Sequence, residues 1–196
     1  MKQHIISKLR SAEVRHDDYD WIYVTDLLPE EEYWAIRENQ DSNRMLELFD
    51  DPEIVKILYD KFSNSSIRSE KISSIYSFWQ TAGSGYSLKP HEDSYPRVFT
   101  MTYYFAENDQ TPEAGTSVYR VNKQDRTWET LATAPYVPNS AMIIAPYTDV
   151  TWHGVNLIEK DVDRQSCVVV YSDLEWTPEQ LHYAEWKPGK NVNYTR

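Results

Sequence analysis

The sequence of 196 residues contains a single cysteine, Cys167. One cysteine forms no disulfide within the chain, and it excludes metal sites that are built on several cysteines. A chain without internal disulfides suits a reducing compartment, so we expect a cytoplasmic protein. Because Cys167 alternates with Ser166 in a strand-like segment, we interpret it as a small core residue rather than as a nucleophile.

Basic residues are also scarce. The chain has 20 Lys and Arg against 31 Asp and Glu, which gives a formal net charge of -11. Proteins that bind nucleic acids or anionic membrane surfaces need clustered positive charge, so neither is expected as a partner. No apolar run approaches the ~18 residues that a transmembrane helix requires, and we expect no membrane partner.

Aromatic residues, in contrast, are abundant. The chain has 15 Tyr, 7 Trp and 5 Phe, and each of these side chains buries a large area when it packs. The length is that of one ordinary domain, so we expect residues 1–196 to form a single domain with a sizeable core.

The first part of the chain, residues 1–70, is predicted to supply a strand and helical support. Residues 21–24 have the apolar and aromatic composition of a short strand. A helical pattern then covers residues 28–65. One helix is expected to begin after Pro29, where three glutamates complement the helix dipole, and a second is expected to open at Asp51 and Pro52.

Residues 71–175 have the pattern of a β-rich core. Short segments of β-branched and aromatic residues alternate with Gly, Pro, Asn and Asp, which is typical of a sandwich or barrel rather than of a parallel sheet. Residues 176–196 are expected to form a short capped helix at 177–181 and a polar tail. The expected strands are 72–81, 97–105, 116–121, 140–145, 150–153 and 166–171.

Three residues of the β region have the pattern of a metal site. His91 and Asp93 are two positions apart, so an extended chain points both side chains to one side and Glu92 away, and we expect Glu92 at the surface. His153 offers a third ligand. Two histidines and one carboxylate form the facial triad of non-haem Fe(II) oxygenases, which leaves coordination positions open. Zinc with the same ligands would usually leave only one position open.

A carboxylate-binding pair follows this triad in the sequence. Arg164 and Ser166 are also two positions apart in a predicted strand, so both side chains lie on one face. The planar guanidinium of arginine binds a carboxylate with two parallel hydrogen bonds, and the hydroxyl can assist it. The pair is therefore a candidate site for an acidic small molecule.

The order and context of these motifs resemble the 2-oxoglutarate- and Fe(II)-dependent dioxygenase superfamily, most closely its prolyl 4-hydroxylase-like branch. The resemblance covers residues 21–173, which is most of the chain. Arg164 stands where many prolyl hydroxylases place a lysine. The segments that carry the resemblance are 21–30 (WIYVTDLLPE), 85–93 (GYSLKPHED), 97–105 (RVFTMTYYF), 114–119 (AGTSVY), 137–144 (VPNSAMII) and 152–155 (WHGV).

The resemblance implies a mostly β (α+β) fold, a double-stranded β-helix or jelly roll, in which residues 71–175 are the catalytic core. It implies Fe(II) as the metal, bound by His91, Asp93 and His153, and 2-oxoglutarate and O2 as co-substrates.

For the distal carboxylate of 2-oxoglutarate, the resemblance implies Arg164, with Ser166 and Tyr104 as further ligands. Tyr104 is equally consistent with a core or surface aromatic residue. Thr100 and Thr102 share its strand face and are expected to line the same pocket.

The expected activity is hydroxylation of a C–H bond. The branch resemblance favours a residue of a peptide or protein, such as prolyl, as the substrate. A free amino acid or another small metabolite is the alternative within the same superfamily. A non-catalytic jelly-roll binding module with a metal site is the alternative from another class of protein.

Overall fold

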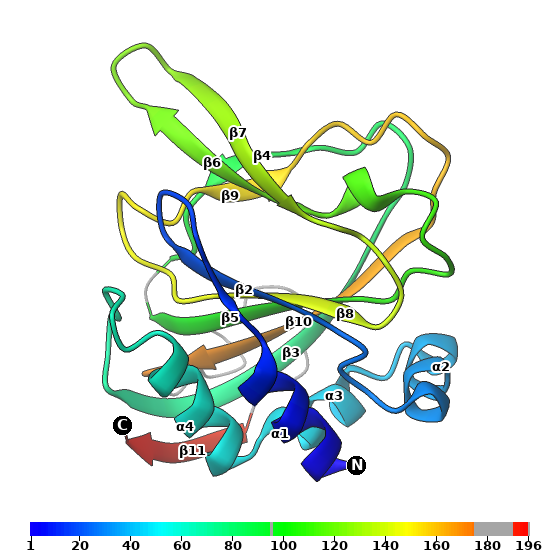
Figure 1. Ribbon diagram of the computed structural model, residues 1–196, viewed down its shortest axis with the longest axis vertical. Helices are drawn as coiled ribbons and strands as arrows, with labels where there is room; N and C mark the ends of the chain where they lie inside the picture. The colour runs from blue at the N-terminus through cyan, green and yellow to red at the C-terminus, as the bar shows by residue number, and fades with distance from the viewer. Residues whose placement is uncertain (95, 175–189, 196) are drawn as a thin grey trace.

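The computed structural model describes residues 1–94 and 96–174, together with the backbone of the strand at 190–195. Two antiparallel sheets face each other (Figure 1). The larger sheet has the order β1-β2-β8-β5-β10-β3-β11, and the smaller has the order β4-β9-β6-β7. The helices are α1 (Lys2–Ser11), α2 (Glu30–Asn39), α3 (Ser42–Phe49), α4 (Pro52–Lys61) and the 3-10 helix η1 (Pro112–Ala114). The strands are β1 (Val14–His16), β2 (Asp20–Thr25), β3 (Lys71–Ala82), β4 (Leu88–His91), β5 (Arg97–Tyr104), β6 (Thr116–Asn122), β7 (Thr127–Ala134), β8 (Ser140–Ile144), β9 (His153–Val155), β10 (Arg164–Ser172) and β11 (Lys190–Thr195).

The helices begin at side chains that cap them. The Asp41 carboxylate accepts a hydrogen bond from the backbone N–H of Arg44 at the start of α3. Asp51 does the same for Glu53 at the start of α4, where Pro52 fits the first helical position. The two predicted helices are therefore three, because the Asp41 cap starts an additional helix between them.

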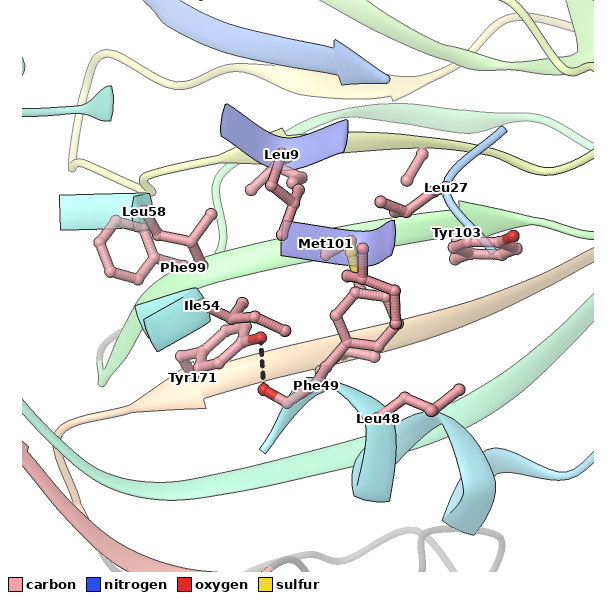
Figure 2. Packing of buried hydrophobic residues seen from close by; sticks show 14 of the residues in the cluster. Leu9, Leu27, Leu48, Phe49, Ile54, Leu58, Phe99, Met101, Tyr103 and Tyr171 are labelled. Carbon is pink, nitrogen blue, oxygen red and sulfur yellow. Dashed lines mark hydrogen bonds between the residues drawn. The ribbon is translucent and has the colours of Figure 1, made fainter. Parts of the chain in front are cut away.

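The main core lies between these helices and the outer face of the larger sheet. Figure 2 shows Leu9 of α1, Phe49 of α3 and Leu58 of α4 against Phe99 of β5 and neighbouring strand residues. The Tyr171 hydroxyl donates a hydrogen bond to the Phe49 carbonyl at 3.0 Å, so this polar group is satisfied within the core. Helices α1, α3 and α4 thus cover one face of the larger sheet and leave its other face to the smaller sheet (Figure 1).

The two faces of the central strands have different surroundings, because successive side chains of a strand point to opposite sides. On β10, Cys167, Val169 and Tyr171 belong to the core on the helix side. Arg164 and Val168, which lie on the other face of β10, line a cavity between the sheets. The whole of β10 is buried, so its Arg164 side chain lies within the protein rather than in solvent.

Most of the predicted strands are present. The segments at 21–24, 72–81, 97–105, 116–121, 140–145 and 166–171 match β2, β3, β5, β6, β8 and β10 within a few residues. The strand expected at 150–153 is instead β9, His153–Val155, because Thr151 and Tyr147 form a turn before it. Helix α1 and strands β1, β4 and β7 were not predicted, and β11 lies within the expected polar tail.

The fold is the mostly β jelly roll expected from the sequence. The helix predicted at 177–181 lies outside the described residues. None of the helices in residues 1–94 and 96–174 is long and apolar enough to cross a membrane.

Cys167 generates a first prediction. Its side chain is fully buried, and burial raises the pKa of the thiol well above its ordinary value of 9.0. Since the thiolate is the reactive form, we expect the native protein to react with a thiol reagent such as DTNB at least ~100-fold more slowly than the urea-unfolded chain. Rapid reaction of the folded protein would contradict the core assignment of Cys167.

Candidate functional site

Two histidines are brought together by strand pairing. Strands β4 and β9 are antiparallel, and their register places His91 directly opposite His153. The two ring centroids are 4.4 Å apart. Both imidazoles therefore project from the smaller sheet to one point, although 62 positions separate them in the sequence.

Each imidazole is oriented by a backbone carbonyl two residues before it. Nδ1 of His91 lies 3.1 Å from the Lys89 carbonyl, and Nδ1 of His153 lies 2.9 Å from the Thr151 carbonyl. A carbonyl only accepts hydrogen bonds, so both Nδ1 atoms carry the proton and donate it. Both Nε2 atoms are then left with a free lone pair, which is the form that binds a metal.

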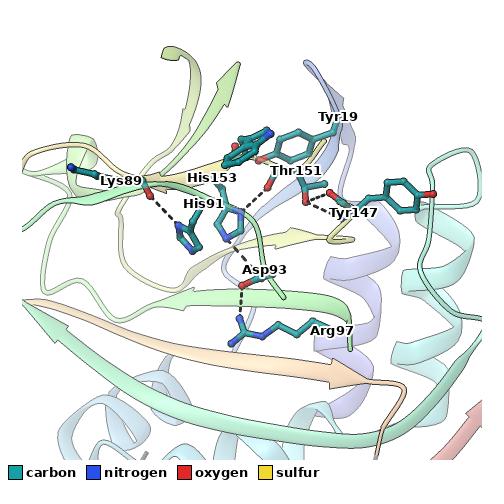
Figure 3. A network of polar contacts seen from close by, with 9 residues as sticks. Tyr19, Lys89, His91, Asp93, Arg97, Tyr147, Thr151 and His153 are labelled. Carbon is teal, nitrogen blue, oxygen red and sulfur yellow. Dashed lines mark hydrogen bonds and ion pairs between the residues drawn. The ribbon is translucent and has the colours of Figure 1, made fainter. Parts of the chain in front are cut away.

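Asp93 completes the cluster. One ligand atom from each of His91, Asp93 and His153 lies within 4.8 Å of the others. Figure 3 shows the three side chains converging, with Arg97 of β5 on the other side of the carboxylate. The Arg97 guanidinium donates to Oδ1 of Asp93, whereas Oδ2 is buried without a hydrogen-bond partner and lies 3.8 Å from Nε2 of His153.

Burial and charge set the protonation of these groups. Burial raises the pKa of the Asp93 carboxyl, but His153 (when protonated), Arg97 and the Thr100 hydroxyl lower it by more, so the pKa lies below its ordinary value of 3.8. Burial lowers the pKa of His153 below 6.5, although Asp93 acts in the opposite direction. Near neutral pH the site thus offers an ionised carboxylate and a neutral imidazole.

Gly154 allows the close approach of the two histidine strands. A Cβ atom added at this position would lie 2.3 Å from the Leu88 carbonyl oxygen and 3.0 Å from that of Lys89. The Lys89 carbonyl is also the group that orients His91. The glycine after His153 is therefore required for the geometry of the opposite histidine.

The cluster opens into a cavity of about 560 Å³ between the sheets. Its volume is in the range of small-molecule sites. Thr100 and Thr102 of β5 lie in its wall, as their strand face predicted. The lining residues are Phe78, Trp79, Gln80, Tyr86, Leu88, His91, Glu92, Asp93, Ser94, Arg97, Thr100, Thr102, Thr116, His153, Gly154, Val155, Arg164 and Val168.

Arg164 lies in the wall of the same cavity and is only 3% exposed. Its Nε donates to the Ala114 carbonyl at 2.7 Å, and its Nη1 donates to the Ser166 hydroxyl at 3.1 Å. No described acidic side chain forms an ion pair with it. A buried guanidinium without an acidic partner is costly, so the pocket is suited to an anionic ligand.

Ser166 and Tyr104 both lie beside the Arg164 guanidinium. Ser166 holds the Arg164 guanidinium and is not among the residues that line the cavity. The Tyr104 ring lies 5.7 Å from the guanidinium, and its hydroxyl accepts a hydrogen bond from the backbone N–H of Thr116. Burial raises the pKa of this hydroxyl, while the charge of Arg164 acts against the rise. The structure thus places both residues around Arg164, and their contact with a ligand stays a prediction.

Sequence reasoning placed Glu92 wrongly at the surface. The side chain is half-buried and lines the cavity, and its Oε1 is enclosed. The alternation rule fails here because β4 ends at His91, and Glu92 and Asp93 follow in irregular chain. Reasoning from the sequence also missed the ion pair between Asp93 and Arg97, which stands four positions later.

The close approach at Gly154 generates a second prediction. Gly154→Ala should displace the Leu88 and Lys89 carbonyls and move His91, which lowers the thermal midpoint and weakens binding of Co(II), used as a metal probe, by ~10-fold or more. Gly83→Ala is the matched control, because the nearest atom to its added Cβ is 3.9 Å away. Equal thermal midpoints and Co(II) affinities in the two variants would contradict this reading of Gly154.

The sequence matches no known family model and no curated protein. Solved structures, in contrast, resemble most of the chain. A Pseudomonas putida prolyl-4-hydroxylase aligns with a TM-score of 0.54 at 12% identity, over 89% of this chain and 95% of the other. HygX from Streptomyces hygroscopicus, solved with nickel and 2-oxoglutarate bound, aligns with a TM-score of 0.54 at 11% identity, over 89% of this chain and 94% of the other.

A third similar structure is SnoN, a non-haem α-ketoglutarate-dependent epimerase from nogalamycin biosynthesis. It aligns with a TM-score of 0.50 at 14% identity, over 97% of this chain and 95% of the other. At identities this low the likeness concerns the fold. The resemblance seen in the sequence is confirmed at that level: this chain has the fold of the prolyl-4-hydroxylase, HygX and SnoN.

Proposed function

We propose that the protein is an Fe(II)- and 2-oxoglutarate-dependent oxygenase that hydroxylates a C–H bond of a substrate held in the cavity. One observation carries this proposal. His91, Asp93 and His153 converge at the wall of the same cavity into which the unpaired Arg164 guanidinium faces. The cavity thus combines a site for a metal cation with a site for the carboxylate of a diacid. The fold shared with HygX, which was solved with 2-oxoglutarate, supports the same reading.

The donor set fits Fe(II). Oδ2 of Asp93 is buried and lacks a hydrogen-bond partner, and its 3.8 Å separation from Nε2 of His153 is too wide for a hydrogen bond. A shared cation would satisfy both atoms. Two imidazoles and one carboxylate form the facial set that non-haem Fe(II) oxygenases use.

The surroundings of Arg164 fit the distal carboxylate of 2-oxoglutarate. The bonds to Ala114 and Ser166 fix the guanidinium, and no described acid neutralises it. A charge-assisted pair with a carboxylate would offset the cost of burying this charge. We therefore assign Arg164 as the residue that anchors the co-substrate, with Ser166 and Tyr104 as the groups that position it.

The bound iron and 2-oxoglutarate would supply the oxidising chemistry, in which O2 is consumed and succinate and CO2 are released. The residues of the chain hold and shield these groups. Arg97 keeps Asp93 ionised, and the Lys89 and Thr151 carbonyls hold both imidazoles in the tautomer with a free Nε2. Arg164 orients the diacid, and Phe78 and Val168 provide apolar walls.

For the substrate, we propose a small molecule or a single side chain of a peptide, because the cavity volume of about 560 Å³ suits a ligand of that size. The prolyl-4-hydroxylase likeness favours a peptidyl substrate such as prolyl. A free amino acid or another small metabolite is the alternative. A non-catalytic binding module has no need of a carboxylate anchor beside a metal triad, and the buried Arg164 therefore argues for catalysis.

The metal and co-substrate assignment generates a third prediction. Anaerobic addition of Fe(II) and 2-oxoglutarate should produce the weak visible charge-transfer band of the iron chelate. His91→Ala and Asp93→Ala should abolish the band, because each removes one of three protein ligands. His16→Ala is the matched control, since His16 is exposed and lies outside the cavity. A band of equal strength in the two site variants, or no band in the unmodified protein, would refute the assignment.

Arg164 generates a fourth prediction. Arg164→Gln should raise the KM for 2-oxoglutarate by about 30-fold or more, since loss of one partner of a buried charge pair costs at least about 2 kcal/mol. It should also abolish the rise in thermal midpoint that 2-oxoglutarate gives to the metal-loaded protein. Arg120→Gln, a change in an exposed arginine that pairs with Asp18, should alter neither quantity. An unchanged KM in Arg164→Gln would show that another group holds the diacid.

A further inference from the structure

One carboxylate in the cavity has no task in the function proposed above. In the sequence, Glu92 stands between the proposed metal ligands His91 and Asp93. Its side chain lines the cavity, and its Oε1 is buried without a hydrogen-bond partner. In residues 1–94 and 96–174, no lysine, arginine or histidine forms an ion pair with it. An enclosed carboxylate oxygen without a donor is costly, so its position calls for an explanation.

The other charges of the cavity wall have partners. Asp93 is paired with Arg97 and faces the proposed metal, and Arg164 is assigned to the distal carboxylate of 2-oxoglutarate. Of the described charged residues that line the cavity, Glu92 is then the one with neither an ion pair nor an assigned ligand. A cationic group would balance this charge, and no described residue supplies one.

The remaining wall is suited to such a cation. Phe78 and Tyr86 line the same cavity, and the faces of aromatic rings attract ammonium and guanidinium groups. The net charge of -11 also favours the approach of a cation over that of an anion. Arg164 and Arg97 lie toward opposite ends of β10, because Arg164 begins this strand and Arg97 pairs with Ser172 at its end. The Asp93–Arg97 pair, which Glu92 adjoins in the chain, is thus kept apart from the anion anchor Arg164.

We propose that Glu92 binds an ammonium or guanidinium group of the primary substrate, and that the substrate is therefore a basic molecule. This inference rests on the proposed function, and it favours a basic substrate over the prolyl residue named there. Because Glu92 and the proposed metal ligands line one cavity, the proposal places the positively charged group and the oxidised carbon of the substrate in that same cavity. Two sources have this chemistry: a free basic small molecule, and a lysine or arginine side chain of a peptide.

Probes that differ only in charge test the proposal. The protein is loaded with 2-oxoglutarate and with Zn(II), which takes the same ligands as Fe(II) without redox chemistry, and binding is followed by ligand-observed NMR. N-methylguanidinium is compared with its neutral isostere N-methylurea. The variant is Glu92→Gln, which keeps the shape and removes the charge. The matched control is Glu38→Gln, which removes the same charge from the exposed face of α2.

We expect N-methylguanidinium to bind the unmodified protein and Glu38→Gln with equal affinity. Its affinity for Glu92→Gln should be lower by about 10-fold or more. N-methylurea should bind the unmodified protein more weakly than the cation does. The proposal is overturned if the cation does not bind, if the urea binds as well as the cation, or if Glu92→Gln binds it as the unmodified protein does.

Competition then separates the two sources of the cation. Displacement of N-methylguanidinium by free L-arginine or L-lysine supports a small basic substrate, and displacement by the capped peptide acetyl-Gly-Arg-Gly-amide supports a peptide side chain. If neither the free amino acids nor the peptide displaces N-methylguanidinium, the proposal is overturned. Failure of the parent function is seen separately, as the absence of the Fe(II)–2-oxoglutarate band in the unmodified protein. If the Fe(II)–2-oxoglutarate band is present but Glu92→Gln does not change the affinity for the cation, only the present inference is refuted.

Discussion

The site depends on one constraint, the antiparallel register of β4 and β9. It places His91 opposite His153, and Gly154 lets the two strands approach closely enough for both imidazoles to reach one point. Backbone carbonyls orient the rings, because Lys89 and Thr151 accept the Nδ1 protons. A shift of one residue would turn a histidine away from the cavity. The pairing of two short strands therefore fixes the geometry of the candidate metal centre.

The larger sheet supplies the second half of the site through the same period-two alternation. Strands β5 and β10 bury Met101 and Val169 beneath the helices and direct Thr102 and Arg164 toward the cavity. The helices therefore contribute to the site indirectly, since they cover the outer face and leave the inner face to polar residues. Bonds to Ala114 and Ser166 hold the guanidinium in place before any ligand arrives. Such preorganisation lowers the cost of ordering a bound diacid.

Much of this arrangement follows from the sequence. Strong local patterns predicted β5 and β10, and the spacing of Arg164 with Ser166 predicted that their side chains lie together. His91 and Asp93 converge as predicted, although the regular alternation assumed for them is absent. The failures have physical causes. Strand β4 is only four residues long and rich in polar groups, so it lacks a strand pattern, and the chain leaves it at His91. The alternation that was expected to turn Glu92 outward therefore does not apply, and a carboxylate placed at the surface lies in the cavity wall.

Direct observation of the metal environment tests the central claim most directly. X-ray absorption of the Fe(II)-loaded protein reports the imidazole ligands through their multiple-scattering features. We predict two imidazoles in the unmodified protein and one in His153→Ala. A spectrum with fewer than two imidazoles, or one that His153→Ala leaves unchanged, would contradict the claim that paired strands bring His91 and His153 to one metal.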